Sequence, residues 1–499
     1  MAQEITGAKK SKVNSVSARV LKVMGLFSGV QVLSILTSVI RTKLVAIWLG
    51  PAGMGLFGLY YSGLETISSL TQMGTGTGVV RELAVTPAAL IPRLVTVIRR
   101  WGLALGLIGA TLTVALSPLL SRLTFGDESH TTGYVLLAAA VLLLTLSNTE
   151  SAVFQGLHRY SRLAKTTVAG AFTGLIVCIP MYYFWGIDSV IPSLLAYALM
   201  TWICRGLFRE KVATPSPAPD LRETFATGKG FAILGIYITV TTFASNAVSY
   251  VFMSYLNRVG GPEQAGFYQA GFTLVNRYIG LVLVAVGMEY LPRLSQVNHS
   301  PRRVEMFLSH ELTLMMLVIL PLITLFITAD ELIVNLLYDR NFIVMLPFIT
   351  WGIVGTVFRT WSWCLAYIIL ARSDGKAYLV TELLSALVAI LLNIVMFNRW
   401  GIAGLGYGYT LWYLFYLAEV WILCRKRYHL KVGGKMIRLP IVVLLICAVA
   451  AVCRSTFGIW GAAPFVILSL VISWVGMKRL LHASPLSMLK KFVRPAKKD

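Results

Sequence analysis

The sequence predicts an all-α integral membrane protein with about fourteen transmembrane helices. Of the 499 residues, 57% are hydrophobic and only 13% are charged, whereas soluble globular chains carry about 25% charged residues. The apolar residues form long runs, and a run of about 20 such residues is enough to cross a bilayer. Lys and Arg are concentrated in every second connection between these runs. These observations argue against a soluble enzyme and against a disordered chain.

The apolar runs follow one another with short connections. They are expected near residues 20–40, 47–72, 97–120, 133–155, 164–185, 187–206, 230–257, 266–291, 310–328, 341–371, 376–397, 402–424, 437–455 and 458–477. Basic residues precede the first run, as in a signal peptide, but no convincing small-residue cleavage site follows before Arg41. We therefore expect a retained first span.

The distribution of positive charge predicts the orientation. If the N-terminus lies in the cytoplasm, 35 of the 44 Lys and Arg residues fall in cytoplasmic segments, as the positive-inside rule requires. The net charge of +23 then reflects membrane topology, and no nucleic-acid partner is expected. The basic tail after residue 489 is expected to lie on anionic lipid. The six cysteines form no C-x-x-C pair and the six histidines are scattered, so neither disulfides, a metal site nor a cofactor is expected.

An internal repeat appears when the sequence is shifted by 211 residues. Gly50-Pro51 then meets Gly261-Pro262, and Gly55 meets Gly266, each at the same point of a six-span unit. Six is an even number, so the two units enter the membrane from the same side, as in several transporter folds. The predicted organisation is an N-terminal tail (1–18), a six-helix bundle (19–206), a cytoplasmic linker (207–229), a second bundle (230–424) and two further helices with a basic tail (425–499).

Several ionisable residues fall within or at the ends of the predicted spans, where charge is expensive to insert and indicates function. Arg41, Lys43, Arg277 and Arg359 are the cationic candidates. Together with polar stripes in both halves, they predict a wet, partly cationic cavity between two lobes. The alternative is that Arg41 and Lys43 extend to the interface, and that Arg277 and Arg359 have structural roles.

Two carboxylates and two indoles complete the candidate set. Glu65 and Glu150 are expected either to carry a proton or to form structural ion pairs with an Arg. Trp361 and Trp363 are candidates for stacking on sugars, and the alternative is that they belong to the core or face lipid. The predicted extracytoplasmic loops are all short, so no loop domain is expected to hold a catalytic site.

The chain resembles the Wzx-type polysaccharide flippases over roughly residues 15–425. The resemblance rests on the order and spacing of degenerate motifs: SVIRTKLVAIWLGPAGMGLF (38–57), QAGFYQAGFTLVNRYIGL (264–281), EYLPRLSQ (289–296), LARSDGKAYLVTELL (370–384) and WGIAGLGYGYTLWYLFY (400–416). It is nearest to the lipid III and O-antigen flippases. Their wider group, the multidrug/oligosaccharidyl-lipid/polysaccharide (MOP) exporter superfamily, has two six-helix bundles in a V shape.

The resemblance implies export of an undecaprenyl-diphosphate-linked oligosaccharide across the bacterial inner membrane by alternating access. Arg41, Lys43, Arg277 and Arg359 would then bind the diphosphate, since anionic phosphates lose their water in hydrocarbon. Membrane lipids and, in the pathway, a polysaccharide polymerase and a chain-length regulator are the expected partners. Three alternatives stay open: a MATE-like ion-coupled antiporter, a membrane-embedded polymerase or ligase, and a membrane scaffold without transport activity.

We predict that reporter fusions or cysteine labels placed after Lys435 and at the C-terminus report the cytoplasm. The reason is the concentration of positive charge, which assigns both termini to that side. An extracytoplasmic C-terminus would contradict an even number of spans.

Overall fold

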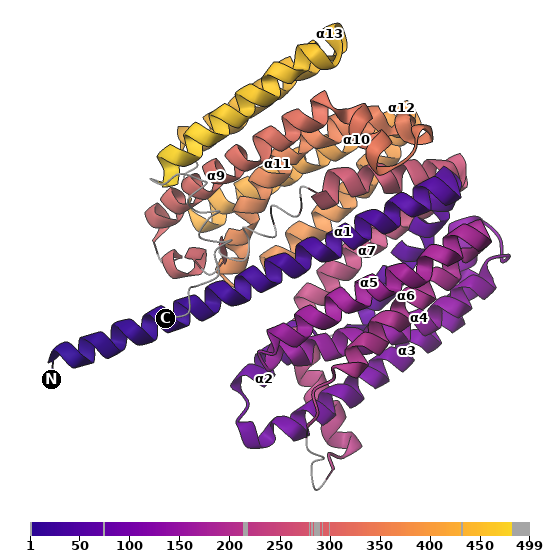
Figure 1. The fold of residues 1–499 in the computed structure, drawn as a ribbon, viewed down its shortest axis with the longest axis vertical. Coiled ribbons are helices and arrows are strands. Elements are labelled where there is room, and N and C mark those ends of the chain that lie inside the picture. Colours follow the sequence, from indigo (N-terminus) through magenta and orange to yellow (C-terminus); the bar gives the residue numbers. More distant parts are fainter. Residues whose placement is uncertain are drawn as a thin grey trace. The chain divides into compact units, whose positions relative to one another are not determined.

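The chain is almost entirely helical in the computed structural model (Figure 1). The structure describes residues 2–72, 75–212, 218–278, 280, 283, 290–291, 293–298, 300–430 and 433–481, and within these ranges it leaves the side chains of 2–29, 31–32, 77, 234, 277–278, 435 and 481 undescribed. Parts of the predicted tails and linker, namely residue 1, 213–217 and 482–499, lie outside this description.

Helices account for each described segment in turn. They are α1 (Ala2–Thr71), α2 (Thr77–Val85), η1 (Ala88–Leu90), α3 (Ile91–Phe125), α4 (Thr131–Gly156), α5 (Tyr160–Trp185), η2 (Gly186–Ser189), α6 (Val190–Leu207), α7 (Leu221–Phe272), the π-helix η3 (Thr273–Tyr278), α9 (Pro301–Thr328), α10 (Asp330–Leu337), η4 (Arg340–Met345), α11 (Leu346–Ala371), α12 (Gly375–Tyr428) and α13 (Gly434–Leu481). Nine helical segments in these described ranges are long and apolar enough to cross a membrane. The chain is a multi-pass membrane protein.

Four of the longest helices contain a chain reversal or kink at a glycine with positive φ. The four residues are Gly50 (φ 68°), Gly261 (φ 80°), Gly401 (φ 59°) and Gly458 (φ 66°). Their ψ values lie between 174° and −144°, a backbone region that is open essentially to glycine alone. Each of these helices therefore consists of two segments joined at one residue.

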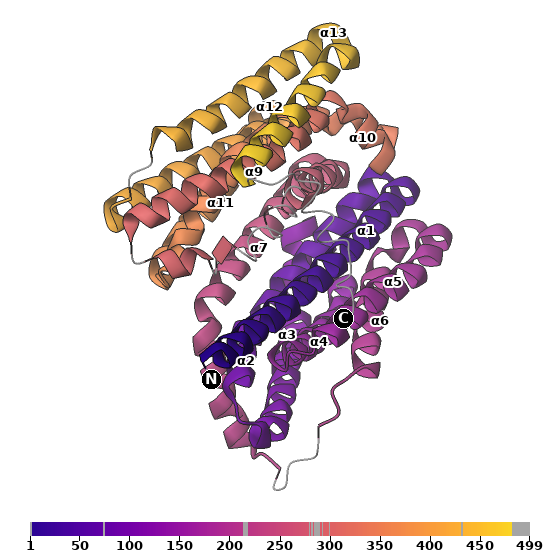
Figure 2. The same cartoon turned by 60° about the vertical axis from the view of Figure 1, so that its left-hand side comes forward.

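In α12 the glycine reverses the chain into a hairpin. The Trp412 Nε1–H donates to Ser385 Oγ at 2.8 Å, and the Tyr416 hydroxyl donates to Glu382 Oε1 at 2.7 Å. Residues 27 apart on a straight helix would be separated by about 40 Å. The two arms of α12 must therefore run antiparallel, with the turn at Gly401 (Figure 2).

The 211-residue repeat has a direct structural counterpart. The backbone at Gly55 is so close to the Pro262 carbonyl that a Cβ atom there would lie 1.9 Å from its oxygen, and a Cβ at Gly266 would lie 1.9 Å from the Pro51 oxygen. Gly55 and Gly266 are 211 positions apart, and so are Pro51 and Pro262. Equivalent residues of the two repeats thus contact each other reciprocally, as they do about a two-fold axis.

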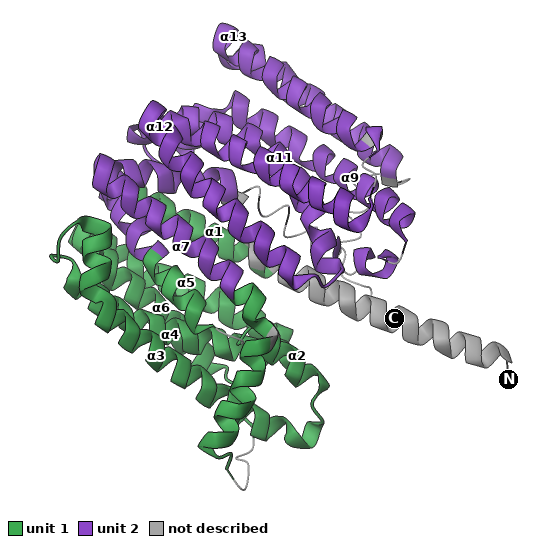
Figure 3. Ribbon diagram, turned by 180° about the vertical axis from the view of Figure 1, so that it is seen from behind, with its two compact units in different colours: residues 1–48, 63–239 green, residues 49–62, 240–499 purple. Residues whose placement is uncertain are grey.

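The chain divides into two compact units, residues 1–48 with 63–239 and residues 49–62 with 240–499 (Figure 3). In the first unit, α2, α3, α4 and the beginning of α7 share one core, formed by Val79, Leu83, Val95, Ile98, Ala152, Val153 and Phe231. In the second unit, α12 packs on α11 and α13 packs on α9, where Thr324 and Ser469 share a hydrogen bond of 2.8 Å.

Two boundaries differ from the sequence-based prediction. The first helix continues through residues 41–46, which were assigned to a connection, and the chain turns at Gly50. Arg41 and Lys43 consequently lie inside a helix. The helix α7 begins at Leu221, inside the segment predicted as linker. It begins there because Glu223 pairs with Arg93 at 2.7 Å and Phe225 packs edge-on against Trp101, which hold the helix on the first unit.

We predict that Gly401→Ala lowers the free energy of unfolding by about 1–3 kcal/mol, because a side chain is strained at this φ. A Cβ at this position meets no atom within 4 Å, so the loss reports backbone strain alone. Gly230→Ala is the matched control. This exposed position within α7 also has open space for a Cβ and shows no positive φ, so alanine there is expected to be neutral or mildly stabilising. Thermal unfolding in detergent compares the two, and equal stabilities would contradict the prediction.

Candidate functional site

A guanidinium lies among tyrosines in the second unit. Arg359, on α11, donates from Nη1 to the Asn276 carbonyl oxygen at 2.9 Å and to the Tyr409 hydroxyl at 3.4 Å. Its Cζ lies 5.8 Å from the centre of the Tyr413 ring. The structure gives Arg359 no ion pair with a carboxylate in the part of the chain that it describes. Among the described residues its charge is held by a carbonyl, a hydroxyl and a π-face, none of which is negatively charged.

The two arms of α12 carry further polar groups on the side where they meet. Glu382 accepts from the Tyr416 hydroxyl at 2.7 Å, and Oε2 of Glu419 is buried without a hydrogen-bond partner. These groups lie on the hairpin that also supplies Tyr409 and Tyr413 to Arg359. Glu382 and Glu419 are 37 positions apart in the sequence. The hairpin at Gly401 is what brings the two carboxylates to one polar surface.

The other predicted cations lie elsewhere. Arg41 is 7% exposed, and its Cζ lies 4.5 Å above the Tyr197 ring in the first unit. Lys43, two residues further along α1, is half-buried. Arg277 lies on η3, and its side chain is outside the described part of the structure. Arg41 and Arg359 are each described within their own unit, so a shared cavity stays a prediction.

The remaining candidates have well-defined surroundings. Glu65 is exposed on α1. Trp361 is 6% exposed and packs against Trp421 at 5.8 Å between ring centres. Trp363 lies 4.2 Å from the Tyr367 ring and 5.7 Å from the Tyr290 ring, and it is half-buried. Of the two indoles, Trp363 is the more accessible.

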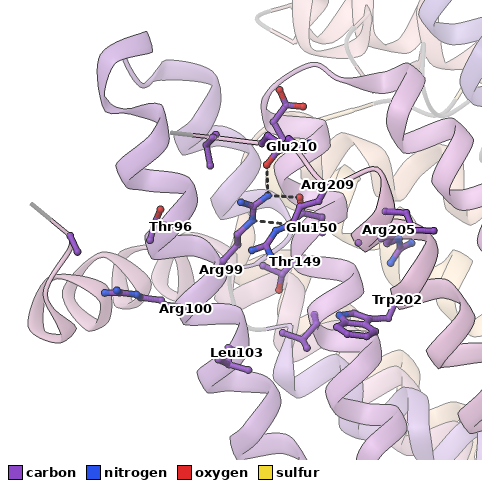
Figure 4. Close-up of a pocket in the computed structure, with 16 residues that line it drawn as sticks. Thr96, Arg99, Arg100, Leu103, Thr149, Glu150, Trp202, Arg205, Arg209 and Glu210 are labelled. Carbon is purple, nitrogen blue, oxygen red and sulfur yellow. Dashed lines mark hydrogen bonds and ion pairs between the residues drawn. The ribbon is translucent and has the colours of Figure 1, made fainter. Parts of the chain in front are cut away.

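A cavity of 830 Å³ lies at one end of the first unit, between α3, α4, α6 and the segment that follows α6 (Figure 4). Glu150 is one of the residues that line it. Arg99 forms a two-pronged ion pair with this carboxylate, with distances of 2.7 Å and 3.0 Å, and the Arg209 guanidinium lies 3.8 Å from it. Arg99 also donates to the Glu210 carbonyl oxygen at 2.9 Å, which fixes the chain where it leaves α6.

This cavity was not predicted as a site from the sequence. Glu150 was a candidate, but Arg99, Arg205 and Arg209 were counted only as cytoplasmic charges. Arg205 contacts Asn148 Oδ1 at 3.3 Å, and its Nε is buried without a hydrogen-bond partner. Burial lowers the pKa of Arg209, the charge of Arg99 lowers it further, and Glu150 offsets part of the effect. Positive charge is therefore in excess here.

Comparison with known proteins gives the family. A family model described as polysaccharide biosynthesis protein matches residues 19–347. The chain belongs to this family. It is 22% identical over 410 residues to proteins named lipid III flippase from Escherichia coli (strain K12) and Shigella flexneri, an alignment that covers 77% of this chain and 94% of each relative.

Solved structures give the fold. A lipid II flippase MurJ in an inward closed conformation matches 92% of this chain and all of its own, with a TM-score of 0.66 and 14% identity. An inward-facing MATE-family multidrug resistance transporter of the MOP superfamily matches with the same TM-score, 13% identity, 79% of this chain and 94% of its own. The predicted all-helical membrane fold is confirmed, and these two solved structures share it. Both matched structures are transporters.

We predict that Glu150→Gln destabilises the protein by about 3 kcal/mol, because it leaves Arg99 without a negative partner. The two side chains are only 10% and 16% exposed, so water replaces little of the lost interaction. Thermal unfolding in detergent measures the loss.

The matched control for this substitution is Glu128→Gln. Glu128 pairs with Arg122, but these side chains are 53% and 66% exposed, and pairs of this kind contribute little. The double variant Glu150→Gln/Arg99→Gln should recover part of the loss, since it removes the unpaired charge. If Glu150→Gln and Glu128→Gln unfold at the same temperature, the buried ion pair has no role in stability.

Proposed function

We propose that this chain is a flippase that moves an undecaprenyl-diphosphate-linked oligosaccharide from the inner to the outer leaflet of the bacterial inner membrane, for surface polysaccharide assembly. The family assignment supports this, and so does the similarity to the lipid III flippases over 94% of their length. The fold is one on which related proteins carry large amphipathic substrates or drugs. The family assignment alone does not distinguish between such substrates. The choice therefore rests on the chemistry of the side chains within the spans.

The observation that carries the proposal is Arg359. An arginine within a span is expensive to insert, and most such residues pair with a carboxylate or line a watery path. In the described part of the chain, the groups that contact Arg359 are instead neutral, namely Tyr409, Tyr413 and the Asn276 carbonyl. A neutral surrounding leaves the guanidinium available to an incoming anion, and its planar fork matches two phosphate oxygens. A diphosphate is the anionic part of the proposed substrate.

The other candidates have complementary roles in this proposal. Arg41, Lys43 and Arg277 are the further diphosphate ligands, which the substrate reaches in turn as the lobes rock. Trp363 is the better candidate to face a sugar. Glu65 is the candidate for proton coupling, whereas Glu150 is occupied by Arg99. A polymerase and a chain-length regulator act on the product.

The surface supports the proposed orientation, with both termini in the cytoplasm. Exposed aromatic side chains gather beside the glycine reversals: Trp48 near Gly50, Tyr183, Phe184 and Trp185 before Gly186, Trp400 before Gly401, and Phe457 and Trp460 around Gly458. Aromatic belts of this kind mark the membrane interface. The opposite helix ends carry Arg93, Arg99 and Arg100 of α3 and Arg205 of α6. We therefore assign the glycine reversals to the outer face and these arginines to the cytoplasmic face.

A MATE-like antiporter is the second candidate. The MATE structure matches the fold with the same TM-score as the lipid II flippase. Glu419 is half-buried, and its buried Oε2 atom has no hydrogen-bond partner among the described residues, as a cation-exchanging site would. A cationic drug, however, would meet Arg359 as a like charge. The two candidates therefore differ in the sign of the substrate charge.

We predict that Arg359→Ala abolishes surface-glycan export in a deletion strain while the protein still accumulates in the membrane. Arg359→Lys should restore part of the export, because a point charge keeps the attraction to phosphate and loses the two-pronged geometry. Arg122→Ala, which removes an exposed arginine, is the control and should export normally. Complementation with parallel immunoblots measures each variant.

The deletion strain itself tests the function. It should accumulate lipid-linked oligosaccharide on the inner face and lose one surface glycan. Unchanged glycans with increased drug sensitivity would favour the antiporter. Full export by an abundant Arg359→Ala protein would remove Arg359 from the site.

A further inference from the structure

The cavity around Glu150 holds more positive than negative charge. Five cationic side chains line it, namely Arg99, Arg100, Arg205, Arg209 and Lys211, against the two carboxylates Glu150 and Glu210. The carboxylates are already engaged, since Arg99 pairs with Glu150 and both Arg159 and Arg162 pair with Glu210. Both carboxylates of the cavity are therefore neutralised by ion pairs, and further cationic side chains in its wall have no carboxylate of the cavity left to pair with.

Arg205 is the clearest of the remaining cations. Its Nη1 reaches Asn148 Oδ1 at the long distance of 3.3 Å, and its Nε is buried without a partner. No carboxylate pairs with it in the part of the chain that the structure describes. Figure 4 shows it on the wall of the cavity, close to Trp202 and on the same helix. A buried guanidinium N–H group without a partner is destabilising unless a ligand satisfies it.

Apart from Thr96 and Thr149, the rest of the wall is apolar, and it includes side chains exposed on the outside of the bundle. Leu103, Trp202 and Leu207 line the cavity and are 45%, 40% and 77% exposed. In a membrane protein such side chains contact lipid chains. The cavity thus combines cations at the end of the bundle with an apolar path along α3 and α6. This arrangement is complementary to a lipid that has a negatively charged headgroup and hydrocarbon chains.

We propose that this cavity binds the phosphate headgroup of an anionic membrane phospholipid, with Arg205 and Arg209 on the phosphate and the acyl chains along Leu103 and Trp202. Basic pockets between transmembrane helices on the cytoplasmic side hold headgroups in this way. The site is separate from the proposed translocation path, because none of Arg41, Lys43 or Arg359 lines it. The bound lipid replaces the missing negative charge and joins α3, α4 and α6 to the segment that leads to α7.

Native mass spectrometry of the full-length protein tests the proposal. The probes are phosphatidylglycerol, phosphatidylcholine with the same chains, undecaprenyl diphosphate and inorganic phosphate. The protein should bind phosphatidylglycerol in preference to phosphatidylcholine. Arg205→Gln should weaken this binding about tenfold, as loss of a charge-assisted hydrogen bond does. Arg122→Gln removes the same charge from an exposed arginine on the same helix as Arg99, and it should leave binding unchanged.

Each other outcome overturns the proposal. Equal affinity for the two phospholipids excludes headgroup selection, and unaltered phosphatidylglycerol binding by Arg205→Gln excludes the cavity. If Arg205→Gln weakens undecaprenyl diphosphate and leaves phosphatidylglycerol unchanged, the cavity belongs to the substrate. Displacement of phosphatidylglycerol by inorganic phosphate at equal concentration indicates a free-anion site. If Arg205→Gln does not fold, Lys211→Gln, on the exposed segment after α6, carries the test with an expected loss of about threefold.

Discussion

Hydrocarbon offers the backbone no hydrogen-bonding partner, and this constraint shapes the whole chain. Each span must pair its own amide and carbonyl groups within a helix. Departures from helical backbone are therefore found mainly where the chain reverses. At Gly50, Gly261, Gly401 and Gly458 one residue in a glycine-only conformation makes the break. A single-residue break leaves the fewest backbone groups without partners. The break at Gly401 also brings the two arms of α12 together, so that Glu382 on the first arm accepts a hydrogen bond from Tyr416 on the second.

The reciprocal contact between the repeats follows from the same chemistry. Lipid chains are as apolar as leucine, so helices in a membrane associate through close packing and through small residues that permit it. At Gly55 and Gly266 the backbones approach so closely that no side chain fits. Because Pro51 and Pro262 are the partners, the residues that a 211-residue shift aligned in the sequence are those that touch. A repeat inferred from few matches thus corresponds to a physical contact.

The sequence predicted well whatever depends on composition and periodicity, and less well what depends on packing. The all-helical membrane fold follows from apolar length, and the reversals near Gly186, Gly261, Gly401 and Gly458 coincide with gaps between predicted runs. The continuation of α1 to Gly50 was missed because Arg41 and Lys43 resemble a connection. Burial of Arg41 against Tyr197 is a tertiary effect that no local pattern contains. The cavity around Glu150 was missed for the same reason, since its residues come from four separate segments.

Arg99, Arg359 and Arg205 show two ways of keeping a cation at a membrane. Arg99 is neutralised by Glu150 in a two-pronged pair, so its charge stabilises the bundle and is no longer available. Arg359 and Arg205 are instead held by neutral groups, in one case tyrosines and a carbonyl and in the other a single amide. A buried cation without a counter-charge raises the free energy of the folded protein, and a bound anion would offset that cost. On this argument the partner of an arginine, more than its depth in the membrane, distinguishes a structural charge from a ligand-binding one. It is the common basis of the two anion sites that we propose, at Arg359 and at Arg205.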